Sequence, residues 1–149
     1  MNVVMFMVNS KYLVGGANKD VQVWQVADGK QVVTMPVECQ IICVATSRDG
    51  RWFAVGLATD KVLVWDMKTY KQVFVNKNSF IKPDFNVFIK DIDFSPDLSH
   101  LISTDGGLNT ATIWDIPVWH SILLYLACWK VWKLNHDEPH TAKYSPQGD

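Results

Sequence analysis

The chain has few cysteines and little net charge, and each scarcity excludes a class of protein. Its 149 residues include three cysteines, Cys39, Cys43 and Cys128, and carry a formal net charge of −1. An odd, sparse set of cysteines argues against a disulfide framework and fits a reducing compartment. A chain close to neutrality has no long-range attraction for phosphate backbones, so nucleic acid is not expected as a partner.

Targeting and membrane segments are also missing. Residues 1–12 have no basic region followed by a small-residue cleavage site, so they do not resemble a signal peptide. The uncharged apolar run Ile116–Trp129 is 14 residues long, shorter than the roughly 18 that a membrane helix needs. We expect an intracellular protein, cytoplasmic or nuclear, that does not enter a membrane. The wider run Ile116–Leu134 is expected to be a buried strand, with a short helix as the alternative.

The composition is that of a globular domain with an unusual number of tryptophans. Hydrophobic residues make up 48% of the chain and charged residues 19%, which is neither disordered nor collagen-like. A compact chain of this length buries roughly 70% of its unfolded surface, so it can form a core. The seven tryptophans are explained in part by a repeat.

Three stretches of the chain share one pattern, beginning at Lys11, Arg51 and His100. Each has an apolar strand, a short polar or glycine-containing turn, and an alternating strand that ends in tryptophan. These tryptophans, Trp24, Trp65 and Trp114, are 41 and 49 residues apart. A period near 40–45 residues with four short strands per unit is typical of a propeller blade. All three are expected to be core residues.

The turns between the expected strands have suitable residues. Asp28-Gly29 and Asp49-Gly50 are hairpin dipeptides, because glycine adopts a positive φ at no steric cost. Ser95-Pro96-Asp97 and Ser145-Pro146-Gln147-Gly148 form the same kind of turn after an apolar strand.

These motifs resemble the WD-repeat (WD40) family over nearly the whole chain. Trp65-Asp66 and Trp114-Asp115 match the dipeptide that names the family, and Trp24-Gln25 matches half of it. Segments 91–97 and 142–149 match the family's first strand and the turn after it. The resemblance implies an all-β fold, a partial, open β-propeller of four-stranded antiparallel blades.

We expect a single WD-repeat region over residues 1–149. Its blades are expected at about 3–35, 41–75 and 89–132, with the start of a fourth at 136–149 and a loop insertion at 76–87. Known propellers close with about four to eight blades, so three and a fraction would leave apolar faces and strand edges unpaired. Either the natural protein is longer, or the chain is a fragment, or copies associate through open blade edges; we favour the fragment.

The chain departs from the family in its polar residues. The family often places an aspartate six residues before the tryptophan, in a hydrogen-bonded set with His and Ser or Thr. Here those positions hold Asn18, Thr59 and Leu108, and Asp20, Asp60 and Asp105 lie out of register. The Gly-His dipeptide is absent and only His136 is near its expected place, so this network is expected to be weak or absent.

A search for catalytic, cofactor and metal sites yields none. Cys39, Cys43, His136 and His140 could suggest zinc, but the two pairs are 93 residues apart, far from the spacing of a zinc finger. No phosphate-binding glycine motif or nucleophile elbow occurs.

The remaining candidate residues have structural interpretations. Asp91 and Asp93 point to the same side of one strand and are expected to form a solvated face. His100 and His120 have no partner in the sequence and are expected at the surface or in packing. Trp52 is expected in the core rather than as an interface anchor, whereas the repeat does not explain Trp119, Trp129 and Trp132.

The sequence therefore predicts a non-enzymatic scaffold that binds one or more proteins of unknown identity, as the resemblance implies. The alternative is a truncated, degenerate propeller fragment with no independent activity. An enzyme would need a convergent set of titratable groups that the sequence does not display.

Overall fold

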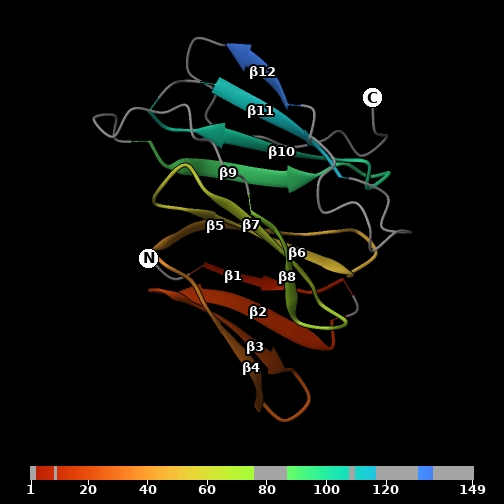
Figure 1. Ribbon diagram of the computed structural model, residues 1–149. Helices are drawn as coiled ribbons and strands as arrows, with labels where there is room; N and C mark the ends of the chain where they lie inside the picture. Colours follow the sequence, from red (N-terminus) through yellow and green to blue (C-terminus); the bar gives the residue numbers. More distant parts are fainter. Residues whose placement is uncertain (1–2, 9, 76–86, 108–109, 117–130, 136–149) are drawn as a thin grey trace.

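The computed structural model describes residues 3–8, 10–75, 87–107, 110–116 and 131–135. The described chain is all β, with twelve strands in three four-stranded sheets and no helix. The three sheets stack along the chain, from β1–β4 through β5–β8 to β9–β12 (Figure 1). This confirms the all-β class and the expected four-stranded antiparallel units.

Each sheet is a meander of consecutive antiparallel strands. The first contains β1 (Val3–Phe6), β2 (Tyr12–Ala17), β3 (Asp20–Gln25) and β4 (Gln31–Pro36). The second contains β5 (Ile41–Thr46), β6 (Trp52–Leu57), β7 (Val62–Asp66) and β8 (Lys71–Val75). The third contains β9 (Ile89–Phe94), β10 (His100–Asp105), β11 (Thr110–Asp115) and β12 (Val131–Asn135).

The run Ile116–Leu134 includes part of the last strand. Residues 131–135 pair with β11 as β12, so this part is a strand and not a helix. Residues 117–130, all but the last residue of the expected loop at 76–87, and the expected fourth unit at 136–149 lie outside the described residues.

Two apolar clusters hold the sheets together, one in each gap between neighbours. The first joins the first and second sheets and includes Val14, Val21, Phe53 and Trp65. The second joins the second and third sheets and includes Val62, Ile92, Leu101 and Trp114. The second sheet is therefore covered on both faces, as its nearly uniform apolar strands β6 and β7 predict.

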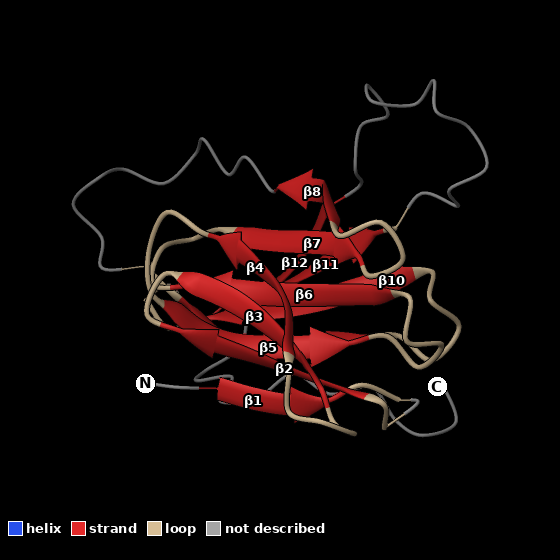
Figure 2. Cartoon of the chain, turned by 90° about the horizontal axis from the view of Figure 1, so that it is seen from below, coloured by secondary structure: helices blue, strands red, loops and turns tan. Residues whose placement is uncertain are grey.

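The same irregularity recurs in the first two sheets. The register between the third and fourth strands shifts just before the tryptophan, between Val23 and Trp24 and again between Val64 and Trp65. A bulge increases the local twist of a strand pair. Figure 2, viewed from below, shows strands of successive sheets crossing one another as twisted sheets do.

Candidate interaction site

One end of the sheet stack displays five hairpin turns. In a four-stranded meander, the turn between the first two strands and the turn between the last two lie at the same end. These are residues 7–11, 47–51 and 95–99 between first and second strands, and 26–30 and 67–70 between third and fourth. In Figure 1 the turns that follow β5, β7 and β9 lie on the right, and the turn that follows β3 lies at the bottom. We call this end the turn end.

The first-to-second turns of the second and third sheets are built alike. Ser47 Oγ donates to Asp49 Oδ1 at 2.5 Å and accepts from the Trp52 amide at 2.8 Å. Ser95 Oγ donates to Asp97 Oδ1 at 2.6 Å and accepts from the His100 amide at 2.9 Å. The Ser-x-Asp pattern therefore satisfies a strand-opening amide and closes the turn, as Asp and Ser side chains do in local turns.

The first-to-second turn of each of the three sheets has one residue in the left-handed region of backbone conformation. The residue is Ser10 in the first sheet (φ 52°), Gly50 in the second (φ 70°) and Leu98 in the third (φ 62°). In each, its amide donates to the carbonyl three residues before it, at 2.7–2.9 Å. The sequence predicted the glycine turn at Asp49-Gly50, and the backbone shows that leucine occupies the same place in the third sheet.

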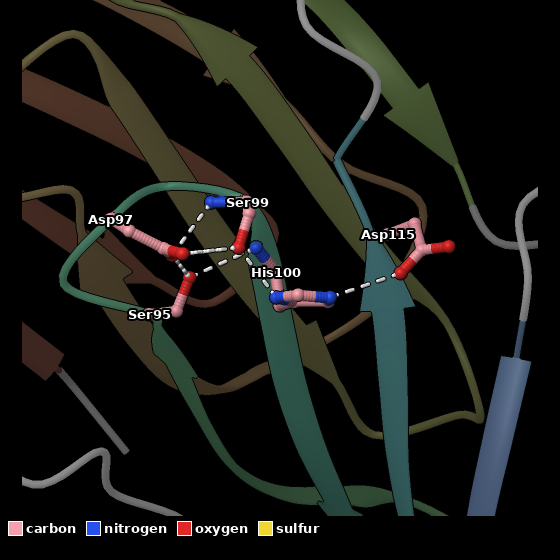
Figure 3. Close-up of polar contacts among 5 residues, drawn as sticks. All are labelled: Ser95, Asp97, Ser99, His100 and Asp115. Carbon is pink, nitrogen blue, oxygen red and sulfur yellow. Dashed lines mark hydrogen bonds and ion pairs between the residues drawn. The ribbon is translucent and has the colours of Figure 1, made fainter. Parts of the chain in front are cut away.

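The aspartates of the two Trp-Asp dipeptides are each held by a basic side chain from the neighbouring turn. Arg51 Nη2 lies 3.5 Å from Asp66 Oδ2 in the second sheet. His100 Nε2 lies 3.2 Å from Asp115 Oδ1 in the third sheet (Figure 3). Gln25 takes this position in the first sheet, so that sheet has no ion pair there. These aspartates therefore tie the turn end to the third strand of their sheet.

His100, which was expected at the surface or in packing, is partly exposed and also bonds within its own turn. Its Nδ1 lies 2.6 Å from Ser99 Oγ, and Ser99 Oγ lies 2.7 Å from both carboxylate oxygens of Asp97 (Figure 3). Ser99 Oγ has one proton to donate. When the His100 ring is neutral and donates from Nε2 to Asp115, its Nδ1 must accept the Ser99 proton, which is then not available to Asp97. When the ring is doubly protonated, it donates to both Ser99 and Asp115, and the Ser99 hydroxyl can donate to Asp97. The charge on His100 thus decides how many of these bonds form together.

The turn stabilises the charged form of Asp97. Hydrogen bonds from Ser95, from the Ser99 amide and from the Ser99 hydroxyl lower the pKa of Asp97 well below its usual range. Asp97 is exposed, so water screens part of this effect. The carboxylate stays ionised through the physiological range and serves as the hub of the turn.

The polar network that the sequence predicted to be weak or absent is partly present in the third sheet. Trp114 Nε1 donates to Ser103 Oγ at 2.9 Å, and both residues are buried. The strand registers place Gly15 and Val55 at the positions that match Ser103 in the other sheets. The bond occurs in one sheet only among the described residues, which is compatible with the expected weak network.

Basic side chains gather at the turn end of the second sheet. Arg48, Arg51, Lys68 and Lys71 are exposed there. Asp49 accepts turn hydrogen bonds, and the buried Asp66 pairs with Arg51, so both acids of this end are occupied within the protein. Four cations against two such acids leave a local excess of positive charge, which favours an acidic partner surface.

The tryptophans that mark the repeat do not share one environment. Trp65 and Trp114 are each 3% exposed, and Trp52 is 4% exposed, so their core placement is confirmed. Trp24 is only half-buried, and its predicted core placement is wrong. It points away from the second sheet, and no described sheet packs on that side.

Other predicted residues are only partly within the described chain. Cys43 is buried and Cys39 is half-buried, and Asp91 and Asp93 are half-buried on β9. His120, His136, His140, Cys128, Trp119 and Trp129 lie outside the described residues. Within the described ranges, no group of three or more His, Cys, Asp or Glu side chains could hold a metal ion. No helix long and apolar enough to cross a membrane occurs among the described residues.

The stacked four-stranded sheets define a segment of a β-propeller, and solved structures share this arrangement. The structure described as U3-55K matches 76% of this chain and 35% of its own, with a TM-score of 0.66 at 15% identity. Hydrazine synthase of Kuenenia stuttgartiensis matches 97% of this chain and 39% of its own, with a TM-score of 0.75 at 17% identity. At these identities the likeness concerns the fold alone.

Sequence comparison finds similarity to WD-repeat proteins. Residues 29–66 match the profile described as "WD domain, G-beta repeat". Human pre-mRNA-processing factor 17 is 25% identical over 129 residues, which cover 84% of this chain and 21% of that protein. Bovine WD repeat-containing protein 1 is 36% identical over 76 residues, which cover 51% of this chain and 12% of that protein. Residues 29–66 therefore match a WD repeat, and the chain is similar to WD-repeat proteins, spanning about a fifth or less of these relatives' length.

Proposed function

We propose that the chain is a non-enzymatic scaffold that binds protein partners through its turn end. The observation that carries this proposal is the stack of three rigid sheets with five hairpin turns at one end. Repeat proteins use such extended surfaces for binding, and the fold alone does not determine the partner. The relatives are named as a pre-mRNA-processing factor and a WD repeat-containing protein, which fits an intracellular role, cytoplasmic or nuclear.

The second sheet's turn end is the most specific part of this surface. Its exposed cations Arg48, Arg51, Lys68 and Lys71 would attract an acidic protein segment, and charges at an interface rim chiefly speed association. Binding should therefore weaken as salt concentration rises. Nucleic acid and membranes are not among the partners that we propose.

Crosslinking in cells tests this proposal with paired variants. The double variant Arg48→Glu/Lys68→Glu reverses charge at the turn end, and Lys19→Glu reverses charge at the opposite end of the first sheet. We expect the first variant to lose its crosslinked protein partners and the second to keep them. Equal capture by both variants would rule out the turn end as the binding surface.

Cooperative folding tests the alternative of a degenerate remnant. A scaffold should unfold in one sharp transition with a β-type circular dichroism spectrum. A remnant should show no cooperative transition and should expose apolar surface to dyes. The second result would contradict the scaffold even if proteins were captured from cells.

A further inference from the structure

A leucine with a positive φ lies in one of the turns at the turn end. Leu98 has a φ of 62° in the third sheet, where the first and second sheets have Ser10 and Gly50. Bulky residues rarely adopt this backbone conformation. The Gly50 amide makes the same turn hydrogen bond, at 2.9 Å, as the Leu98 amide does. The turn therefore forms equally well without a side chain at this position.

The Leu98 side chain lies outside both apolar clusters. It is half-buried, and among the described residues it is neither a member of a cluster nor one of the side chains that pack against them. Tyr70 also has a positive φ (55°), but it packs against the first cluster. Backbone strain that persists without such packing is typical of binding surfaces. Leu98 is therefore a candidate contact for a partner.

The two pairs of neighbouring sheets pack in the same way. A Cβ at Gly16 would overlap Ile41 of the second sheet. A Cβ at Gly56, the matching residue of the second sheet, would overlap Ile89 of the third. The step from one sheet to the next is therefore repeated, and contacts seen between the first two sheets locate residues of the third.

This repeated step locates Leu98 relative to the second sheet. In the first pair of sheets, a Cβ at Gly50 would lie 3.9 Å from the Val8 Cβ. Val8 stands two residues before the positive-φ position of its turn, and Arg48 stands at the same place in the second turn. The equivalent neighbour of Leu98 is therefore Arg48, at the basic part of the turn end.

One cation of this basic part is held in position. The Arg51 guanidinium lies 4.5 Å from the centroid of the Trp52 ring and 3.5 Å from Asp66 Oδ2. Both neighbours are buried, and the Arg51 side chain is still 49% exposed. A side chain that is already ordered loses little conformational entropy on binding. Together with the exposed Arg48 and Lys68, Arg51 favours a segment that carries carboxylates.

The third turn limits how far an acidic segment can extend. Asp97, directly before Leu98, is exposed and would repel a further carboxylate or phosphate. An apolar side chain at this place would instead contact Leu98 and meet no like charge. A nucleic-acid backbone has a charge at every step, so it fits these two turns less well than a short acidic segment with an apolar end.

We propose that the turn end binds a short, extended protein segment in which acidic residues adjoin one apolar residue. The acidic residues contact the cations of the second sheet's turns, and the apolar residue contacts Leu98. This inference rests on the proposed binding role of the turn end and specifies the partner. Charge alone would accept any acidic segment, whereas the leucine contact adds a requirement for an apolar side chain.

Fluorescence anisotropy with labelled peptides tests this partner chemistry on the full chain. The peptides have a short run of glutamates with a leucine before it, a leucine after it, or a serine at both places. We expect one leucine peptide to bind at least about tenfold more tightly than the serine peptide, because a leucine side chain removed from water contributes that much.

Two variants and one control assign the selection to Leu98. Leu98→Gly removes the side chain and keeps the turn conformation, so it should bind the leucine peptides no more tightly than the serine peptide. Arg48→Glu/Lys68→Glu should weaken binding of every peptide. Val4→Asn is the control, since Val4 is an apolar residue that is 58% exposed on the first sheet, and it should keep the selection. Circular dichroism checks that each variant folds.

The possible outcomes separate this inference from the proposed function. Equal binding of leucine and serine peptides would overturn the inference and leave the turn end as a surface for acidic segments. Selection that persists in Leu98→Gly would also overturn it, as would tighter binding of a single-stranded oligothymidylate than of the leucine peptides. If no acidic peptide binds, the inference is wrong, and crosslinking of protein partners in cells decides the proposed function separately.

Discussion

At the scale of single residues, three turns have a positive φ at the same position but a different residue type there. Ser10, Gly50 and Leu98 all have φ between 52° and 70°, where a side chain costs roughly 1–2 kcal/mol. The turn tolerates this cost because its hydrogen bonds fix the backbone. Substitutions at this position therefore measure how much the backbone strain lowers the stability of the protein.

Replacing leucine at this position should stabilise the protein. We expect Leu98→Gly to raise the free energy of unfolding by about 0.5 kcal/mol, since relief of strain exceeds the added flexibility of the unfolded chain. Gly50→Leu, the matched reverse change, should lower it by a similar amount. Urea midpoints at unchanged slope measure both. A loss of stability in Leu98→Gly would mean that packing by the half-buried leucine outweighs the strain.

The Asp97 hub predicts a dependence of stability on pH. Because the pKa of Asp97 is lower in the folded chain than its ordinary value of 3.8, the carboxylate stabilises the fold above about pH 4. That contribution is lost as the pH falls toward the folded-state pKa. Asp97→Asn should therefore be less stable than the natural chain at pH 7, and the difference should shrink by pH 3.

Denaturant titrations of both proteins at pH 7 and pH 3 measure this difference. Ser95→Ala removes the largest cause of the lowered pKa and should reproduce part of the effect. A difference that stays constant with pH would assign the cost of Asp97→Asn to lost hydrogen bonds rather than to charge.

At the scale of strands and sheets, Gly16 and Gly56 let neighbouring sheets approach closely, because a Cβ at either position would overlap an isoleucine of the next sheet. We expect Gly56→Ala to destabilise the protein by roughly 1–3 kcal/mol, because the new methyl overlaps Ile89 and Cys43. Gly15→Ala is the control: its Cβ would meet the half-buried Trp24 and neighbouring atoms at 3.1–3.3 Å, and it should change stability much less.

A double-mutant cycle locates the cause of that loss. Ile89→Ala alone leaves a cavity, but in the Gly56→Ala background it removes the contact of the new methyl with Ile89 Cγ2. The double variant should therefore lose less stability than the sum of the two single losses. Strict additivity would show that position 56 acts through strand flexibility and not through contact with the third sheet.

The four-stranded sheets could be predicted from the sequence, but the packing of one sheet against another could not. Period-two alternation and dipeptides such as Asp49-Gly50 are local signals, and they predicted the four-stranded units and the burial of Trp65 and Trp114. The environment of Trp24 could not be predicted in this way. Alternation tells which side a residue faces but not whether another sheet covers that side.

The turn-end contacts were missed for a related reason. His100 and Asp115 lie opposite each other on β10 and β11, and their pairing follows only from the register of that hairpin. The same register would have revealed Ser103 beside Trp114. An antiparallel alignment of the second and third strands of each repeat would have predicted both pairs of neighbours.

At the scale of the whole molecule, each sheet in the described part of the chain packs only against its neighbours in sequence. The stability of such a stack is approximately the sum of each sheet's own stability and the interfaces it shares. The second sheet shares two interfaces, through Phe53 and Leu63 on one side and Val62 and Val64 on the other. The first sheet shares one. The stack should therefore open locally from the first sheet.

Native-state hydrogen exchange should reveal this gradient. Amides of β6 and β7 should exchange slowest, because opening them breaks both apolar clusters, and amides of β1 and β2 should exchange faster through local opening. Equal protection of the first and second sheets would show that the stack unfolds only as one cooperative unit.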